Sequence, residues 1–224
     1  GKSKGGLYGD VVEEFDYETG RLLDALEALG LTKNTLVIYT SDNGPWNQDK
    51  YTKNKKGHPK GSIFWGSSGP LRNGKGSCYE GGYRLPCIVR WPGKVPAGRE
   101  SDAVFATIDF MPTFANLSGF KIPDDRVIDG IDQTDLLLGK SDTGRETFYF
   151  DRAGIRKGKW KYLQAKAHFY GYAREDDRPM EEELYDLEND LGETTNLAKN
   201  HPKIVAELRK LTDELPAYRP DERR

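Results

Sequence analysis

The spacing of apolar residues predicts an amphipathic helix near the start of the chain, over residues 10–29. Five apolar side chains recur at steps of four, seven, four and three and share one stripe: Val11, Phe15, Leu22, Leu26 and Leu29. Gly20 interrupts this pattern, and Gly30 stands where a left-handed C-terminal cap is expected. The almost wholly apolar run over residues 35–40 then predicts a short strand covered on both faces.

Glycine-rich stretches separate this strand from the next one. Residues 45–61 are polar and predict a long surface loop. Residues 67–86 contain five glycines and two prolines, too many for a regular element. Residues 87–91 predict another strand, which ends at the Pro92-Gly93 pair.

A second helix is predicted over residues 109–118. Asp109 is expected to accept hydrogen bonds from the free first-turn amides, Pro112 falls in the tolerant first turn, and Gly119 is expected to end the helix. The Asn116-Leu117-Ser118 triplet spells a glycosylation sequon, but its place inside this helix argues against modification.

The pattern changes near residue 145. Four short runs predict an antiparallel meander, at residues 148–150, 153–156, 159–163 and 183–187, with a turn at Lys157-Gly158. A final amphipathic helix enters through Asn200 and Pro202 and uses five apolar positions: Ile204, Val205, Leu208, Leu211 and Leu215.

These patterns together predict the fold class and the domains. The fold class is α/β, with part of a mixed, largely parallel sheet flanked by helices, followed by a small α+β domain with an antiparallel sheet and a helix. The predicted boundary divides residues 1–144 from residues 145–224.

Composition narrows the function classes. The 224 residues carry 34 Lys and Arg against 36 Asp and Glu, and this balance argues against a nucleic-acid partner. No apolar run approaches the roughly 18 residues that span a bilayer, so no membrane span is expected. Cys78 and Cys87 do not make a disulfide framework, and we expect both to be reduced and partly buried. The opening GKSKGG indicates a cut or processed end.

Candidate metal chemistry follows the first predicted strand, at Asp42 and Asn43. In α/β sheets ligands gather beyond the carboxyl ends of strands. A carboxylate and an amide carbonyl are hard oxygen donors that suit Ca²⁺ or Mg²⁺, and a chain that turns at Gly44 brings both to one ion. On these three residues alone, Asp-Asn-Gly is more typical of an ordinary turn, and two oxygens leave a calcium shell incomplete.

Candidate anion chemistry lies in the next glycine-rich stretch. Lys75 stands between two glycines, so its backbone can approach a ligand while the ammonium contacts a sulfate or phosphate group; the alternative is a solvated lysine in a loop. Glu80 and Arg84 flank the Gly81-Gly82 pair and predict a structural ion pair that ties this loop to the sheet, in preference to a catalytic role.

The three histidines give little indication of a catalytic or metal-binding role. His201 is expected at an exposed helix start, His58 lies in the polar loop, and His168 is a candidate for a substrate cleft. No Ser-His-Asp, Cys-His or zinc-ligand spacing is present in the sequence.

Four stretches resemble the type I, formylglycine-dependent sulfatases of the alkaline phosphatase superfamily. In family order they are TLVIYTSDNGPW, GPLRNGKGSCYEGGYRLPCIVRWPG, TIDFMPTFANLSG and LYDLENDLGETTNLA. The resemblance implies sulfate ester hydrolysis, with Asp42 and Asn43 as calcium ligands and Lys75 in contact with the sulfate group. It also implies that the stretch of Glu80, Gly81, Gly82 and Arg84 shapes the site.

The sequence departs from the family where the nucleophile is expected. The family converts a Cys or Ser of a C/S-x-P-x-R motif to formylglycine, and neither Cys78 nor Cys87 lies in that motif. The resemblance therefore covers a C-terminal half, whose partner is the missing N-terminal half with the nucleophile and remaining metal ligands. The chain alone is expected to be inactive.

Other expectations rest on the resemblance alone. Ca²⁺ is favoured over Mg²⁺, the substrate is a sulfated small molecule or glycan, and the compartment is periplasmic, secreted or lysosomal. The loop 45–66 and the segment 164–180, with Arg174, His168, Tyr170 and Tyr172, are candidates for contacting the alcohol part of the substrate. Two alternatives remain open: a phosphate or phosphonate ester hydrolase of the same superfamily, and a non-catalytic binding fragment.

Overall fold

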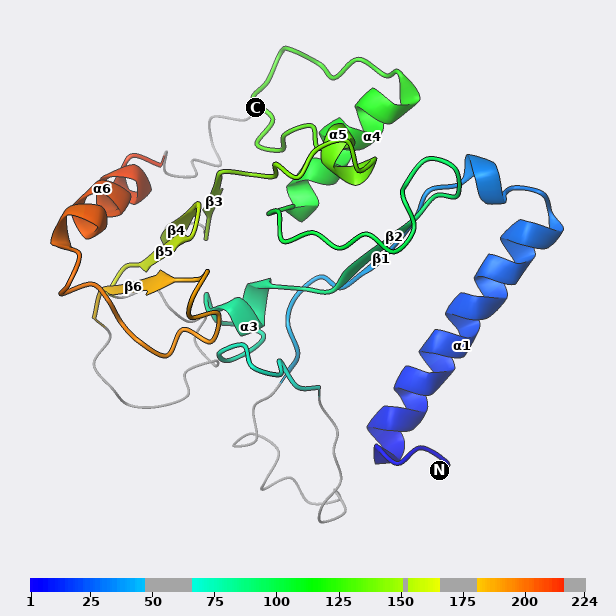
Figure 1. The fold of residues 1–224 in the computed structure, drawn as a ribbon, viewed down its shortest axis with the longest axis horizontal. Coiled ribbons are helices and arrows are strands. Elements are labelled where there is room, and N and C mark those ends of the chain that lie inside the picture. Colours follow the sequence, from blue (N-terminus) through cyan, green and yellow to red (C-terminus); the bar gives the residue numbers. More distant parts are fainter. Residues whose placement is uncertain (47–65, 151–152, 166–180, 216–224) are drawn as a thin grey trace. The chain divides into compact units, whose positions relative to one another are not determined.

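The computed structural model describes residues 1–46, 66–150, 153–165 and 181–215 (Figure 1). The chain divides into two compact units. The first contains described residues 1–42 and 86–146, and the second contains residues 43–46, 66–85 and the described residues from 147 onward. The predicted domain boundary at residue 144 stays a prediction.

The first unit opens with the helix α1 (Gly6–Ala28), which begins four residues before the predicted start. Gly30 has a φ of +68°, which confirms the predicted left-handed cap, and the 3-10 turn η1 (Thr32–Asn34) follows. No residue of α1 is buried, and the predicted apolar stripe faces solvent, with Phe15 60% and Leu22 57% exposed.

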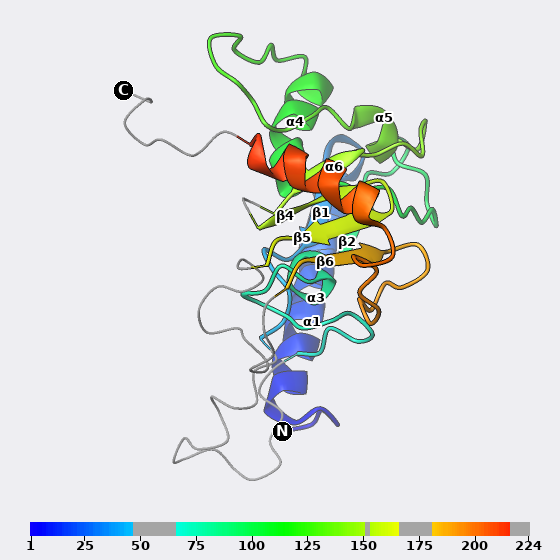
Figure 2. The same ribbon diagram turned by 90° about the vertical axis from the view of Figure 1, so that its left-hand side faces the viewer.

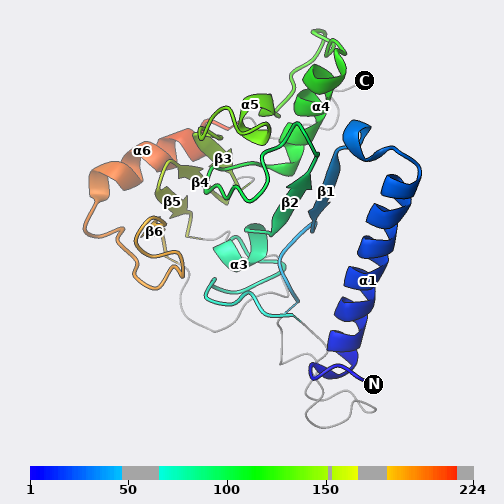
Figure 3. The same cartoon turned by 45° about the vertical axis from the view of Figure 1, so that its right-hand side comes forward.

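The strand β1 (Val37–Thr40) pairs with β2 (Cys87–Arg90), as Figure 3 shows. The pairing is antiparallel, with Val37 opposite Arg90 and Thr40 opposite Cys87. The residues of β1 are half-buried or exposed, so the prediction of a strand covered on both faces is wrong for the described part of the chain. Both strands lie where the sequence predicts them, but no parallel pair occurs among the described residues, and the largely parallel sheet stays a prediction.

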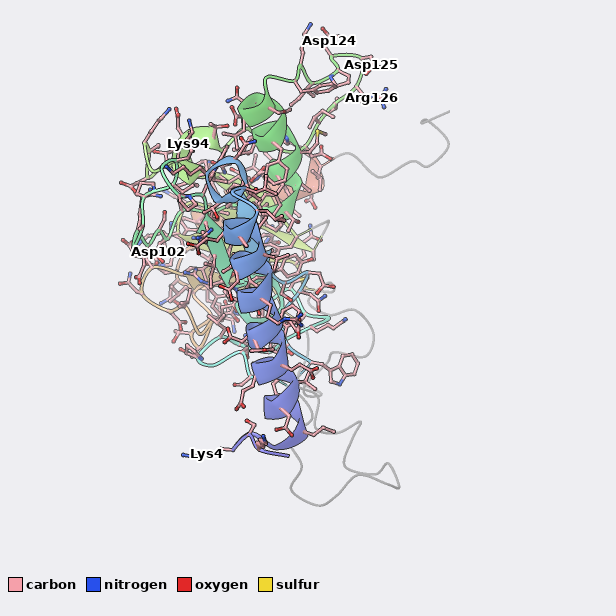
Figure 4. All side chains as sticks on the ribbon, turned by 90° about the vertical axis from the view of Figure 1, so that its right-hand side faces the viewer. Lys4, Lys94, Asp102, Asp124, Asp125 and Arg126 are labelled. Carbon is pink, nitrogen blue, oxygen red and sulfur yellow. The ribbon has the colours of Figure 1, made fainter. Side chains whose placement is uncertain are left out.

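The remaining helices of the first unit are α4 (Phe110–Ser118), which follows the 3-10 turn η2 (Thr107–Asp109), and α5 (Thr134–Leu137). Gly119 ends α4 with a φ of +72°, as predicted. The Asp109 side chain does not cap the first turn of α4, because Arg145 engages both of its oxygens. Beyond α4 the chain turns at an exposed loop whose tip carries Asp124, Asp125 and Arg126 (Figure 4).

The second unit contains the predicted antiparallel meander. Its strands are β3 (Thr147–Tyr149), β4 (Gly154–Lys157), β5 (Trp160–Leu163) and β6 (Glu183–Asp186), and they pair in that order. Tyr162 of β5 lies opposite Ile155 and Leu184, so the three side chains share one face. This confirms the predicted small antiparallel sheet.

The helix α6 (Pro202–Asp213) covers that face of the sheet (Figures 1 and 2). Its predicted apolar positions Val205 and Leu208 are buried in a cluster with the three strand residues. Pro202 occupies the first helical position, as its fixed φ favours. No helix among the described residues is long and apolar enough to cross a membrane.

The opposite face of the sheet packs against the glycine-rich segment that contains α3 (Glu80–Tyr83). Cys78 and Tyr79 from this segment join Phe150, Leu163 and Tyr185 from the sheet in one buried cluster. Cys78 is thus fully buried, whereas Cys87 in the first unit is exposed. Both are free thiols, as predicted, but the expected partial burial of both is wrong.

Candidate functional site

The Asp42-Asn43 pair directly follows β1, as predicted. Asp42 is exposed, and Ser41 Oγ lies 3.4 Å from its Oδ1. Asp42 is the last residue of the first unit, and Asn43, which is half-buried, is the first residue of the second.

Gly44 fixes the path of the chain immediately after this pair. Its N–H donates to the carbonyl of Gly82 at 2.9 Å, and a Cβ built at Gly44 would lie 1.8 Å from the Gly81 oxygen. Only glycine permits this approach of two backbones. The turn that carries Asn43 is therefore locked against α3.

Residues 72–77, which we call the lysine loop, are attached to the same turn. The N–H of Lys75 donates to the Pro45 carbonyl at 2.9 Å, and Gly76 has a φ of +88°. Ser77 closes the loop, because its hydroxyl donates to the Gly74 carbonyl at 2.9 Å. The half-buried side chain of Lys75 makes no hydrogen bond or ion pair with any residue that the structure describes, so its three donors are free for an anion.

In the stretch from Glu80 to Arg84, the first four residues form α3 and Arg84 caps its C-terminus; the first three residues of the helix are buried. A Cβ at Gly81 would lie 2.1 Å from the Asn73 oxygen, and one at Gly82 would lie 2.3 Å from the Ser77 oxygen. The two glycines thus let α3 pack directly on the lysine loop.

The predicted ion pair is present, with Arg84 Nη1 3.9 Å from Glu80 Oε2. It joins the first residue of α3 to the residue that caps its C-terminus, however, and does not tie the loop to the sheet. That link is made by Lys161 of β5, whose ammonium lies 2.9 Å from Glu80 Oε1. Sequence reasoning missed Lys161; the only signal was a lysine inside an otherwise apolar and aromatic strand.

Arg72, at the start of the lysine loop, lies in a second cluster of charged and aromatic side chains. The Arg72 guanidinium lies 3.7 Å from the centre of the Tyr79 ring and donates to the Tyr185 hydroxyl at 2.7 Å. Tyr79 in turn donates to Glu183 at 2.8 Å, and burial raises the pKa of its phenol. These groups satisfy one another, which indicates a structural role.

Several predicted substrate residues lie outside the described residues. They are His168, Arg174, Tyr170, Tyr172, His58 and most of the loop 45–66. His201 occupies the N-cap position of α6, as predicted, but it is half-buried and not exposed, and its ring lies 5.2 Å from that of Trp160.

The donor set at the Asp42-Asn43 pair suits a hard metal ion only in part. The described residues contain no group of three or more His, Cys, Asp or Glu side chains that could hold a metal. Asp42 and Asn43 nevertheless present hard oxygens of the kind that Ca²⁺ accepts, and the Asp42 carboxylate makes no ion pair among the described residues. These residues therefore fit part of a calcium shell, which needs further oxygens.

Two known family models match the sequence of this chain. The sulfatase family model matches residues 4–120, and the model described as N-sulphoglucosamine sulphohydrolase, C-terminal, matches residues 74–219. The chain belongs to the sulfatase family. This confirms the resemblance inferred from the four sequence stretches.

Individual relatives agree with this assignment. An N-acetylgalactosamine-6-O-sulfatase of Bacteroides thetaiotaomicron is 37% identical over 96% of this chain and 43% of its own length. The steryl-sulfatase of Mus musculus is 43% identical over 74% of this chain and 24% of its own length. This sulfatase chain thus spans less than half the length of these curated relatives.

Solved structures show the same fold. A Bacteroides thetaiotaomicron protein studied for the metabolism of multiple glycosaminoglycans superimposes with a TM-score of 0.79 at 36% identity, over 96% of this chain and 45% of its own. A sulfatase from Pseudoalteromonas gives a TM-score of 0.71 at 28% identity, over 91% of this chain and 41% of its own.

Proposed function

We propose that the complete protein that carries this chain hydrolyses sulfate esters. The observation that carries the proposal is the backbone link between the Lys75 loop and the Pro45 carbonyl, two residues beyond Asn43. The link fixes the backbone of Lys75 beside the turn that begins at Asn43, and the Lys75 ammonium makes no hydrogen bond or ion pair with the residues that the structure describes. The membership of the chain in the sulfatase family indicates the class of reaction, which is hydrolysis of a sulfate ester.

Each site residue then has a physical role. Asp42 and Asn43 would supply two oxygens to Ca²⁺, which fits better than Mg²⁺ because it accepts more ligands in a less rigid geometry. When bound, the cation withdraws charge from the sulfate oxygens. Lys75 donates hydrogen bonds to the same group and stabilises negative charge as the ester bond breaks. Glu80, Gly81, Gly82 and Arg84 hold the loop that presents Lys75.

The remaining machinery is proposed to lie in the part of the parent protein outside this sequence. That part would carry the formylglycine nucleophile and the other calcium ligands. The proposal is supported by the share of the relatives that the chain spans, 43% for the bacterial N-acetylgalactosamine-6-O-sulfatase. It follows that the 224-residue chain alone should not turn over an aryl sulfate in the presence of Ca²⁺.

We further infer that the substrate class is a sulfated saccharide. The relative that covers 96% of this chain is named for a sulfated amino sugar, whereas the steryl-sulfatase of Mus musculus covers 74%. His168 and Arg174 remain candidates for contacting the sugar. In the complete enzyme, comparing 6-O-sulfated N-acetylgalactosamine with an aryl sulfate tests this choice, and a preference for the aryl ester would contradict it.

Replacing Lys75 by Ala in the complete enzyme tests the proposed reaction. We expect kcat/KM for sulfate ester hydrolysis to fall by about 10²–10³-fold, because a donor to the developing charge is lost. Lys94→Ala is the matched control, since Lys94 is an exposed lysine (Figure 4), and it should leave kcat/KM unchanged.

Faster cleavage of a phosphonate ester than of a sulfate ester would favour the related hydrolase class. Binding without turnover would favour a non-catalytic role.

A further inference from the structure

A buried charge cluster lies behind the lysine loop, formed by Lys161, Glu80 and Glu193. Lys161 is fully buried, and its ammonium lies 2.9 Å from Glu80 Oε1 and 2.8 Å from Glu193 Oε1. Glu80 is 3% and Glu193 1% exposed. Because an isolated charge at such depth is strongly unfavourable, the three groups depend on one another.

Glu193 also holds the backbone of α3. Its Oε2 accepts the N–H of Glu80 at 2.6 Å, which is the first N–H of the helix. Glu193 adopts a φ of +53°, a left-handed conformation that is unusual for a residue other than glycine. The surrounding structure therefore holds Glu193 in a strained conformation from which it reaches α3.

The position of α3 is transmitted to the lysine loop through backbone contacts. The N–H of Gly81 donates to the Arg72 carbonyl at 2.9 Å, at the start of the loop. Gly82 would place a Cβ 2.7 Å from the Gly74 oxygen, next to Lys75. A shift of α3 cannot be absorbed by flexible side chains at these contacts and must move the loop.

We propose that Glu193 and Lys161 are positioning residues that hold α3 and thereby set the place of the Lys75 ammonium against the sulfate group. This inference rests on the proposed function of Lys75. Neither residue touches the substrate; Glu193 acts through the Glu80 N–H and Lys161 through the Glu80 carboxylate. Glu193, within the LYDLENDLGETTNLA stretch, thus acquires a role that its sequence alone did not indicate.

A double-mutant cycle in the complete, calcium-loaded enzyme tests the proposal. The variants are Lys75→Ala, Glu193→Gln and the two combined, and the readouts are the Kd of inorganic sulfate by calorimetry and kcat/KM with 4-nitrophenyl sulfate. We expect Glu193→Gln to worsen both by about tenfold when Lys75 is present and by less than about twofold when it is absent. Equal factors in both backgrounds would overturn the proposal, because a merely structural role does not depend on Lys75.

Controls separate this inference from the proposed function. Glu207→Gln removes an exposed carboxylate that pairs with Lys157 at 2.7 Å, and it should change neither readout. If Glu193→Gln does not fold, the same cycle is run with Glu193→Asp, which keeps the charge but shortens the reach. A Lys75→Ala variant with unchanged sulfate affinity and kcat/KM would refute the proposed function itself. A damaging Lys75→Ala with an uncoupled Glu193→Gln would refute only the positioning role.

Discussion

Two buried carboxylates of this sulfatase chain differ in how their charge is compensated. Burial raises the pKa of Glu193, and the nearby Lys161 ammonium only partly opposes this effect. Burial also raises the pKa of Asp109, but hydrogen bonds from Arg145 and from two backbone N–H groups outweigh it and bring the pKa below its ordinary value. The balance between burial, which raises the pKa of a carboxylate, and the hydrogen bonds and charges that lower it thus decides the direction of the shift.

Asp109 should make the protein sensitive to acid. Because the pKa of Asp109 is lowered in the folded state, its stabilising contribution is present above about pH 4 and is lost as the pH falls through the folded-state pKa. Asp109→Asn should lower the free energy of unfolding by about 1–3 kcal/mol at pH 7. Urea unfolding at pH 7 and pH 3 should show the difference from wild type shrinking in acid.

Asp125→Asn provides the control for this measurement. Asp125 pairs with Arg126 at the exposed loop tip (Figure 4), where solvent screens the interaction. Its replacement should leave the free energy of unfolding nearly unchanged. A difference between Asp109→Asn and wild type that is the same at both pH values would contradict the role assigned to the Asp109 carboxylate.

At the scale of the elements, the contact between the Gly44 turn and α3 should tolerate no side chain. Gly44→Ala should lower the free energy of unfolding by at least about 2 kcal/mol, because the new methyl group would overlap the Gly81 carbonyl. Gly20→Ala in α1 is the matched control, since no atom beyond the neighbouring residues and the adjacent turns of the helix backbone lies within 4 Å of the position that its new methyl group would take. It should stabilise the helix by about 0.5–1 kcal/mol. Thermal unfolding of Gly44→Ala and Gly20→Ala measures both changes in stability. Equal shifts in Tm for the two variants would contradict the close approach of Gly44 to the Gly81 carbonyl.

Local features of the elements were predictable from the sequence. The left-handed glycines at 30 and 119, the order of the meander strands and the buried face of α6 follow from spacing and turn chemistry within short windows. Exposure of β1 was not predictable, because an apolar run does not reveal what covers it.

The interactions that support the candidate site were predictable only in part. The Asp-Asn-Gly turn and the glycine-flanked lysine could be recognised because their residues are adjacent in the chain. The pairing of Lys161 with Glu80 joins residues 81 positions apart, and sequence spacing carries no information on such a contact. The sequence marks Asp109 as important, but its partner Arg145 lies 36 residues away and was missed for the same reason.

At the scale of the whole molecule, α1 presents an uncovered apolar face. The face includes Leu7, Val11, Phe15 and Leu22, which are between 57% and 63% exposed. Large exposed apolar patches mark surfaces that associate with other protein surfaces. In the complete protein we expect the part outside this sequence to cover this face.

The isolated 224-residue chain should therefore self-associate. Val11→Lys combined with Leu22→Lys should reduce the association, because two charges interrupt the face. Val127→Lys is the control, since Val127 is 89% exposed but lies outside α1. Size-exclusion chromatography with light scattering checks the outcome, and a monomeric wild-type chain at every concentration would refute the expectation.

The contacts that Glu80 makes with residues distant in the sequence also determine when this part of the structure can form during synthesis. Glu80 leaves the ribosome 81 residues before Lys161 and 113 residues before Glu193. Contacts so distant in sequence form late, after the entropy of closing a long loop has been overcome. A ribosome-bound intermediate thus already contains the lysine loop but not the residues that hold it. The sulfate binding proposed for Lys75 would therefore have to await the synthesis of β6 and of Glu193, which follows that strand.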